Sequence, residues 1–177
     1  MTFVKQNRYI PPDHYARIKR RLLPTDAALC DLLRLTGFRV DDVLHTQVWQ
    51  WRRPEITLEE RKTGNIRSVP KTAAVEDALQ RLMGTRYPLG TDPLVPGLRG
   101  WPTDSPFRHR STVWRRFAGA VKEAGLDGYG YTIHSLRKMY AVEKYDQTQS
   151  LLAVQRDLGH KKIETTLWYV CGSDISL

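Results

Sequence analysis

Apolar residues recur every three to four positions in several stretches of this sequence, and a glycine follows most of them. In the clearest stretch, Leu29, Leu32 and Leu33 share one face of a predicted helix that ends before Gly37, because glycine readily adopts the left-handed conformation common after a helix. A chain with this pattern must bury helix faces against one another. Helices are predicted over residues 25–36, 40–44, 72–84, 111–125, 134–145, 150–158 and from 165 onward.

A different pattern lies between the early and the middle helices. Residues 47–51, 55–59 and 66–70 are predicted as three short strands, and residues 62–65 as the hairpin turn between the last two. Gly64 and Asn65 suit that turn because both tolerate positive φ. The expected fold class is therefore mainly α with a small three-stranded antiparallel β-sheet, an α+β arrangement.

The length of 177 residues fits one domain. We expect an N-terminal arm over residues 1–24 and a single domain over residues 25–177, with a loop over the Pro- and Gly-rich residues 87–106. Apolar residues make up 41% of the chain, which is enough for a folded core and excludes wholesale disorder.

Charge favours a polyanionic partner. The chain has 28 Lys and Arg against 19 Asp and Glu, a net charge of +9 at pH 7. Basic side chains that replace the counterions of a nucleic acid gain the entropy of their release. Charge alone does not separate DNA from RNA.

The same sequence argues against secretion and structural zinc. Cys30 and Cys171 are too few for a disulfide framework, and no Cys-x-x-Cys pair is present. Neither a signal peptide nor an apolar run of about 18 residues is found. We expect a soluble, cytoplasmic protein that makes no membrane contact.

Six polar residues stand out as candidates for chemistry: Arg39, Lys62, His134, Arg137, His160 and Tyr169. Each alone is more typical of an ordinary surface or packing position. They occur within five ordered patterns that resemble the motifs of one family, the tyrosine recombinases or phage integrases, over residues 25–170. The patterns are Thr36-Gly37-Phe38-Arg39 with Asp42 three positions on, Lys62-Thr63-Gly64, His134-Ser135-Leu136-Arg137, Leu158-Gly159-His160 and Thr165-Thr166-Leu167-Trp168-Tyr169. Five patterns in order are a far more specific signal than one short motif.

The resemblance implies the tyrosine recombinase catalytic-domain fold and a site-specific DNA recombinase or integrase. Tyr169 would attack the DNA phosphate and form a 3′-phosphotyrosyl intermediate, and Lys62 would protonate the departing 5′ oxygen. His134 would assist proton transfer, and His160 would hydrogen-bond the phosphate. Asp42 is expected to orient the first arginine or to cap a helix.

Elementary chemistry supports a role for Arg39 and Arg137 as a clamp that binds the DNA phosphate. In-line attack on a phosphodiester places negative charge on the non-bridging oxygens, and two guanidiniums can each bind those oxygens bidentately, which a lysine ammonium cannot. A free phenol has a pKa near 10, so the nucleophile Tyr169 needs nearby cations and a proton acceptor. Because the covalent link conserves the energy of the broken bond, no metal, ATP or other cofactor is expected.

The resemblance also implies partners: double-stranded DNA, and further copies of the chain that assemble on DNA, with a tetramer as one form. About 24 residues precede the first matched helix, so the N-terminal clamp domain of most relatives is not expected here. The sequence is consistent with a small family member that has a catalytic domain alone, with a truncated integrase, and with an isolated domain. Only eight residues follow Tyr169, whereas many relatives use a longer C-terminal segment to contact a neighbouring protomer. Both ordered strand exchange within an assembly and relaxation of DNA by one subunit therefore stay open.

Two functions from other classes remain as alternatives. One is a catalytically impaired DNA-binding regulator of recombination, which the intact motifs disfavour. The other is a metal-dependent nuclease, because Glu60 and Lys62 with Asp41 and Asp42 upstream faintly resemble an acid-and-lysine magnesium site. A protein–DNA adduct that persists in EDTA distinguishes recombinase from nuclease.

Overall fold

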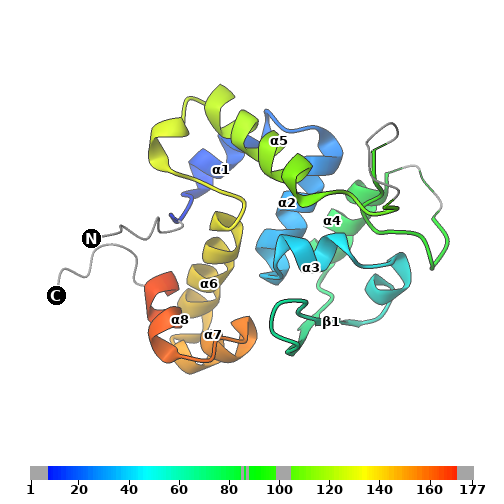
Figure 1. Cartoon of the computed structure of the whole chain (residues 1–177). Helices are drawn as coiled ribbons and strands as arrows, with labels where there is room; N and C mark the ends of the chain where they lie inside the picture. Colours follow the sequence, from blue (N-terminus) through cyan, green and yellow to red (C-terminus); the bar gives the residue numbers. More distant parts are fainter. Residues whose placement is uncertain (1–7, 85, 87, 99–104, 171–177) are drawn as a thin grey trace.

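The computed structural model describes residues 8–84, 86, 88–98 and 105–170. Over these residues the structure is mainly helical with one β-hairpin (Figure 1). The elements, in order, are α1 (Pro12–Lys19), α2 (Pro24–Thr36), α3 (Val40–Leu44), the 3₁₀ helix η1 (Val48–Trp51), β1 (Glu55–Glu59), β2 (Ile66–Pro70), α4 (Ala73–Met83), α5 (Arg110–Glu123), the 3₁₀ helix η2 (Asp127–Tyr129), α6 (Ser135–Thr148), α7 (Leu151–Leu158) and α8 (Ile163–Val170).

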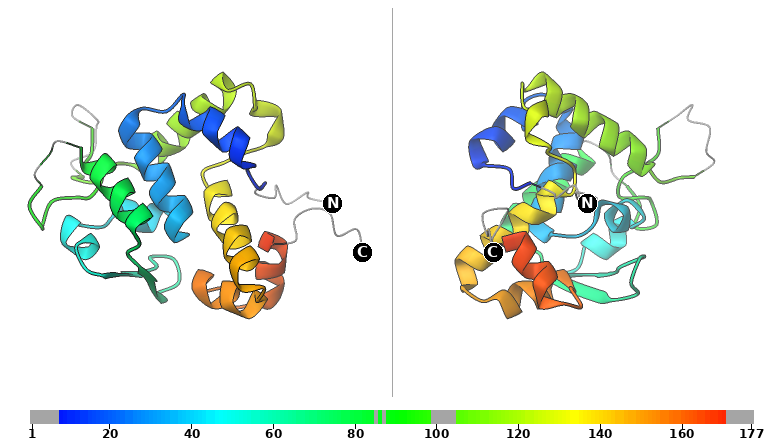
Figure 2. Two further views of the ribbon diagram at one scale, coloured as in Figure 1. Left: turned by 180° about the vertical axis from the view of Figure 1, so that it is seen from behind. Right: turned by 60° about the vertical axis from the view of Figure 1, so that its left-hand side comes forward.

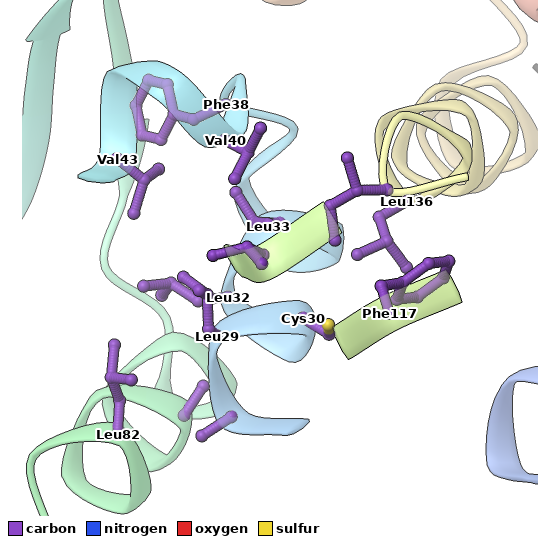
Figure 3. Packing of buried hydrophobic residues seen from close by; sticks show 14 of the residues in the cluster. Leu29, Cys30, Leu32, Leu33, Phe38, Val40, Val43, Leu82, Phe117 and Leu136 are labelled. Atoms are coloured by element: carbon purple, nitrogen blue, oxygen red, sulfur yellow. The ribbon is translucent and has the colours of Figure 1, made fainter. Parts of the chain in front are cut away.

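Helix α2 is central to the core and contacts both α4 and α6 (Figures 1 and 2). Its side chains Leu29, Leu32 and Leu33 are buried, as their spacing predicts. Phe117 of α5 and Leu136 of α6 belong to the same cluster, which Figure 3 shows around α2. Packing of the amphipathic faces, rather than intrinsic helix propensity, thus supplies most of the stability of these short helices.

A second, smaller cluster holds the C-terminal helices together. Ala141 of α6 packs with Val154 and Leu158 of α7, and Tyr169 of α8 packs against them. Helices α6, α7 and α8 contact one another, and α7 also contacts β2. The last helix is therefore attached to the body through α6 and α7.

The sheet has two strands, so the prediction of three was wrong. β1 and β2 pair antiparallel, with Ile56 opposite Val69 and Leu58 opposite Arg67. Residues 47–51 were predicted as the third strand, but Val48–Trp51 form η1. The amide side chain of Gln50 accepts the backbone N–H of Gln47 at 2.8 Å in a reciprocal capping box, which satisfies donors at the start of a helical turn and favours it over a strand.

Helix α1 lies within residues 1–24, which were expected to form an N-terminal arm and for which no helix was predicted. Tyr15 and Ile18 are buried in the main core, and the Tyr15 hydroxyl donates to Asp31 of α2 at 2.8 Å. Pro12 at the first position of the helix and Asp13 in its first turn are favourable there. Cys30 is buried, whereas Cys171 and, within the loop at 87–106, residues 87 and 99–104 lie outside the described residues.

Gly37 connects α2 to α3 in a conformation that requires glycine. Its φ is +62°, and a Cβ at this position would lie 2.4 Å from the ring of Tyr140. Both the left-handed backbone and the close approach of the ring exclude a side chain. The Gly37 carbonyl accepts a hydrogen bond from Arg137 of α6, and the turn places Arg39 at the N-terminus of α3.

Candidate active site

Arg137 is almost completely buried on α6, with a relative exposure of 4%. Its guanidinium donates to the backbone carbonyls of Gly37 and Leu158, each at 2.6 Å. Burial, followed by the charges of Arg67 and Arg39, lowers the pKa of Arg137 to about 10. The guanidinium is therefore still charged at neutral pH, and it ties the α2–α3 turn to the end of α7.

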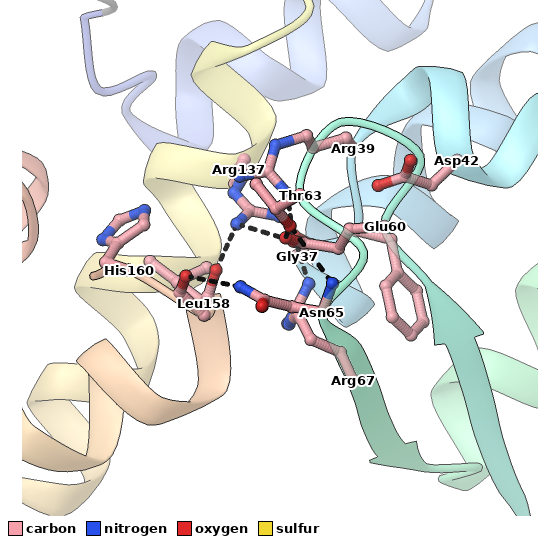
Figure 4. A network of polar contacts seen from close by, with 12 residues as sticks. Gly37, Arg39, Asp42, Glu60, Thr63, Asn65, Arg67, Arg137, Leu158 and His160 are labelled. Carbon is pink, nitrogen blue, oxygen red and sulfur yellow. Dashed lines mark hydrogen bonds and ion pairs between the residues drawn. The ribbon is translucent and has the colours of Figure 1, made fainter.

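Glu60 brings the two motif arginines together (Figure 4). Its carboxylate forms an ion pair with Arg39 and lies 3.5 Å from Nη2 of Arg137. Burial alone would raise the pKa of Glu60, but hydrogen bonds from Arg39 and Thr63 and the charges of both arginines outweigh it and lower the pKa. A buried, ionised carboxylate thus compensates two neighbouring guanidiniums.

Lys62 lies on the exposed turn of the β-hairpin, as predicted. Together with Arg39 and His134 it lines a hollow of about 990 Å³. The remaining lining residues come from α3, from the same turn and from the first turns of α5: Val40, Asp41, Asp42, Arg61, Arg110, Ser111, Trp114 and Arg115. Basic side chains from three separate elements therefore face one concave surface.

His134 directly precedes α6, one turn before Arg137. Partial burial, followed by the charges of Arg137 and Arg39, lowers its pKa below the ordinary histidine value. The imidazole is therefore neutral at physiological pH. A neutral imidazole that faces the hollow can accept a proton.

His160 and Tyr169 are neighbours although they belong to different segments. Their ring centroids lie 5.1 Å apart, and Nδ1 of His160 lies 3.0 Å from the Thr166 hydroxyl on α8. Burial, followed by the charges of Arg137 and Arg39, lowers the pKa of His160 to about 4. His160 is thus also neutral at pH 7 and able to donate one hydrogen bond.

The six predicted site residues are therefore gathered around one region, in two overlapping groups. Arg39, Lys62 and His134 share the hollow, whereas His160 and Tyr169 form a ring pair. Arg137 joins the groups, since it shares Glu60 with Arg39 and binds the carbonyl of Leu158, two residues before His160. Tyr169 packs against the cluster that contains Leu158, and Arg137 binds the backbone carbonyl of the same Leu158.

A family model described as the phage integrase family matches residues 12–174. The chain belongs to the phage integrase family. The tyrosine recombinase XerD of Brucella suis biovar 1 (strain 1330) is 31% identical over 143 residues, which cover 80% of this chain and 46% of that protein. The XerD of Brucella abortus (strain 2308) is similar over the same shares. The chain thus spans about half the length of the curated relatives it matches.

Solved structures show the same fold. A crystal structure of a lambda integrase(75-356) dimer bound to a COC′ core site superposes with a TM-score of 0.76 at 25% identity, over 96% of this chain and 60% of that one. The XerA recombinase superposes with a TM-score of 0.77 at 22% identity, over the same shares. The mainly helical fold with a small antiparallel sheet is that of integrase catalytic domains.

Sequence reasoning missed the role of Glu60 in this phage integrase family member. Asp42 was expected to orient Arg39 or to cap a helix, but its Oδ1 accepts the backbone N–H of Arg61 at 2.9 Å, and the ion pair of Arg39 is with Glu60. The signal was present in the strand alternation, because Ile56, Leu58 and Glu60 are all buried. A carboxylate at an inward-facing position needs a cationic partner.

Arg67, to which sequence reasoning gave no role, supports the same region. It is buried on β2, and it donates to the carbonyls of Gly37 at 3.1 Å and Thr36 at 3.3 Å. Its guanidinium lies 4.8 Å from the ring centroid of Phe38. Burial lowers the pKa of Arg67. Arg67 and Arg137 therefore both bind the α2–α3 turn, at the carbonyl of Gly37.

Stability should fall at mildly acidic pH because His160 prefers to be neutral in the folded state. Unfolded histidine has a pKa near 6.5, whereas folded His160 has a pKa of about 4. Between these values the unfolded chain binds a proton that the folded chain does not, so stability is full above about pH 6.5 and is lost as the pH falls toward 4. Urea unfolding of wild type and His160→Gln at pH 7.5 and 5 measures this, and the wild type should lose more stability. Equal losses would contradict it.

Proposed function

We propose that this chain cleaves and rejoins DNA strands as a site-specific tyrosine recombinase. The observation that carries the proposal is the position of Arg137, which shares the carboxylate of Glu60 with Arg39 and binds the carbonyl of Leu158, two residues before the His160 ring that contacts Tyr169. Two guanidiniums beside a phenol match the needs of a phosphate under in-line attack. Membership of the phage integrase family supports the same chemistry.

In the proposed reaction the Tyr169 oxygen forms a bond to phosphorus while the bond from phosphorus to the 5′ oxygen breaks. Neutral His134 accepts the phenol proton, and Lys62 on the hairpin turn donates a proton to the departing oxygen. Arg39 and Arg137 bind the non-bridging oxygens, and His160 donates a hydrogen bond to one of them. The product is a 3′-phosphotyrosyl link and a free 5′-hydroxyl, and the reverse sequence rejoins a strand.

Double-stranded DNA is the proposed substrate, and the hollow lined by basic residues of α3, α5 and the hairpin turn is its proposed entry. A lambda integrase tetramer has been solved bound to a Holliday junction, which supports assembly of several copies on DNA. A cytoplasmic location is proposed together with this function. Within the part of the chain that the structure describes, no helix is both long and apolar enough to cross a membrane.

The nuclease alternative receives little support from the carboxylates it would use. Glu60 is paired with two arginines, and Asp42 accepts a backbone N–H. Among the described residues, no group of three or more His, Cys, Asp or Glu is arranged to hold a metal ion. The carboxylates in this region instead compensate cations.

A nicked duplex that loses its 5′-hydroxyl fragment after cleavage tests the proposal, with plasmid relaxation as a screen for cleavable sequences. We expect a protein–DNA complex that survives denaturant and forms equally with and without EDTA. Cleavage that EDTA abolishes, without any adduct, would establish the nuclease instead. DNA binding without cleavage on all substrates would establish the regulator.

A further inference from the structure

Glu60 occupies an unusual position for a carboxylate, because it is completely buried, with a relative exposure of 0%. One oxygen, Oε1, is shared between Arg39 and Arg137. The other, Oε2, accepts the hydroxyl of Thr63 at 2.7 Å. Both oxygens are thus engaged, one by the arginines and one by the hairpin turn that carries Lys62.

The two arginines depend on Glu60 to different degrees. Arg137 is fixed by two short hydrogen bonds to the carbonyls of Gly37 and Leu158, and its contact with Glu60 is longer, at 3.5 Å. For Arg39, the described contact of the guanidinium is the ion pair with Glu60. Loss of the carboxylate should therefore release Arg39 and leave Arg137 in place.

The backbone of Glu60 also shapes the turn. Its carbonyl accepts the N–H of Gly64 at 2.8 Å and of Thr63 at 3.1 Å, and its own N–H donates to the Asn65 carbonyl at 2.8 Å. The residue that binds Arg39 thus closes the loop in which Lys62 is held. Lys62 and Arg39 face the same hollow.

We propose that Glu60 is a positioning residue that holds Arg39 in place before DNA arrives and couples it to the turn that carries Lys62. A guanidinium has five N–H donors, so an arginine that shares one carboxylate oxygen keeps donors free for a phosphate. The negative charge also offsets the repulsion between two neighbouring guanidiniums. This inference rests on the proposed recombinase function for its catalytic consequence, but not for its structural one.

The structural consequence can be measured without DNA or activity. The Nε–H signals of Arg39 and Arg137 are assigned by NMR through Arg39→Lys and Arg137→Lys. In Glu60→Gln we expect the Arg39 signal to broaden or disappear and the Arg137 signal to remain. The matched control is Glu59→Gln, which removes an exposed carboxylate one residue away on β1 and should alter neither signal.

The catalytic consequence is measured as the rate of adduct formation at saturating DNA. Glu60→Gln should slow it about 10- to 100-fold, as expected for an ångström-scale displacement of a catalytic group, and Glu59→Gln should not. DNA affinity should change less than about threefold, because the phosphate contacts of the duplex are retained. In an Arg39→Lys background, Glu60→Gln should add at most about twofold, since coupled residues are not additive.

Three results would overturn the inference. The first is an unchanged Arg39 signal in Glu60→Gln, and the second is an equal loss of rate from Glu60→Gln in the wild-type and Arg39→Lys backgrounds. The third is a faster reaction in Glu60→Gln, which would mean that Glu60 competes with the phosphate for Arg39. If Glu60→Gln does not fold, Glu60→Asp replaces it in both measurements. Aspartate keeps the charge but withdraws it by one carbon, so a wild-type rate and Arg39 signal in that variant would also count against the proposal. Failure of the wild type to form any adduct would refute the proposed function and leave the NMR result to decide the role of Glu60.

Discussion

Replacement of Tyr169 by phenylalanine should abolish covalent attachment to DNA while leaving the protein folded and able to bind. The change removes one oxygen from a side chain that is only partly buried on α8, and its ring keeps the packing against α6 and α7. Without the phenol no phosphotyrosyl bond can form, so the adduct on a nicked duplex should fall by at least about 10³-fold. Denaturing gel electrophoresis of labelled DNA measures the adduct.

A matched control distinguishes the nucleophile from a general effect of removing a hydroxyl. Tyr145 of α6 packs against the same small cluster as Tyr169, so Tyr145→Phe alters a neighbouring phenol in a similar environment. It should form the adduct at close to the wild-type rate. An adduct that persists in Tyr169→Phe, or one that mass spectrometry locates on another residue, would refute the assignment of the nucleophile.

Local patterns predicted most of the helices because the physics that forms them is local. The spacing of Leu29, Leu32 and Leu33 and the glycine after α2 lie within one segment, and the structure confirms the helix and its left-handed end at Gly37. The third strand was wrong because Val48, Trp49 and Trp51 have high strand propensity. The capping box of Gln47 and Gln50 and the burial of Trp51 decided the conformation instead.

The site shows the limit of the same reasoning. Ordered motifs predicted six candidate catalytic residues, and the structure brings those six residues into one region. They did not predict that Glu60 connects the arginines, because that contact joins residues 77 positions apart and depends on how the hairpin packs against α6. Helix α1 was not predicted because its eight residues contribute only Tyr15 and Ile18 to the core. Two buried residues are too few to produce a recognisable helical spacing in the sequence.

Replacement of Arg137 should have the second-largest effect, because it alters both the clamp and the fold. Arg137→Ala leaves the carboxylate of Glu60 buried with one partner fewer and removes both hydrogen bonds to the Gly37 and Leu158 carbonyls. Loss of one partner from a buried charge pair costs about 3 kcal/mol of the free energy of unfolding. Loss of a preorganised donor to the developing phosphate charge should slow cleavage about 10²- to 10³-fold.

Arg137→Lys separates the two effects because it restores the charge without the planar fork of donors. A lysine ammonium still compensates Glu60, so we expect part of the lost stability to return in urea unfolding. It cannot bind two carbonyls and a phosphate together, so cleavage should stay about 10²-fold below wild type at saturating DNA. The matched control is Arg34→Lys, which alters a more exposed pair with Glu143 and should change stability by no more than about 1 kcal/mol. If Arg137→Lys cleaves as fast as wild type, charge alone suffices at this position and the bidentate clamp is wrong.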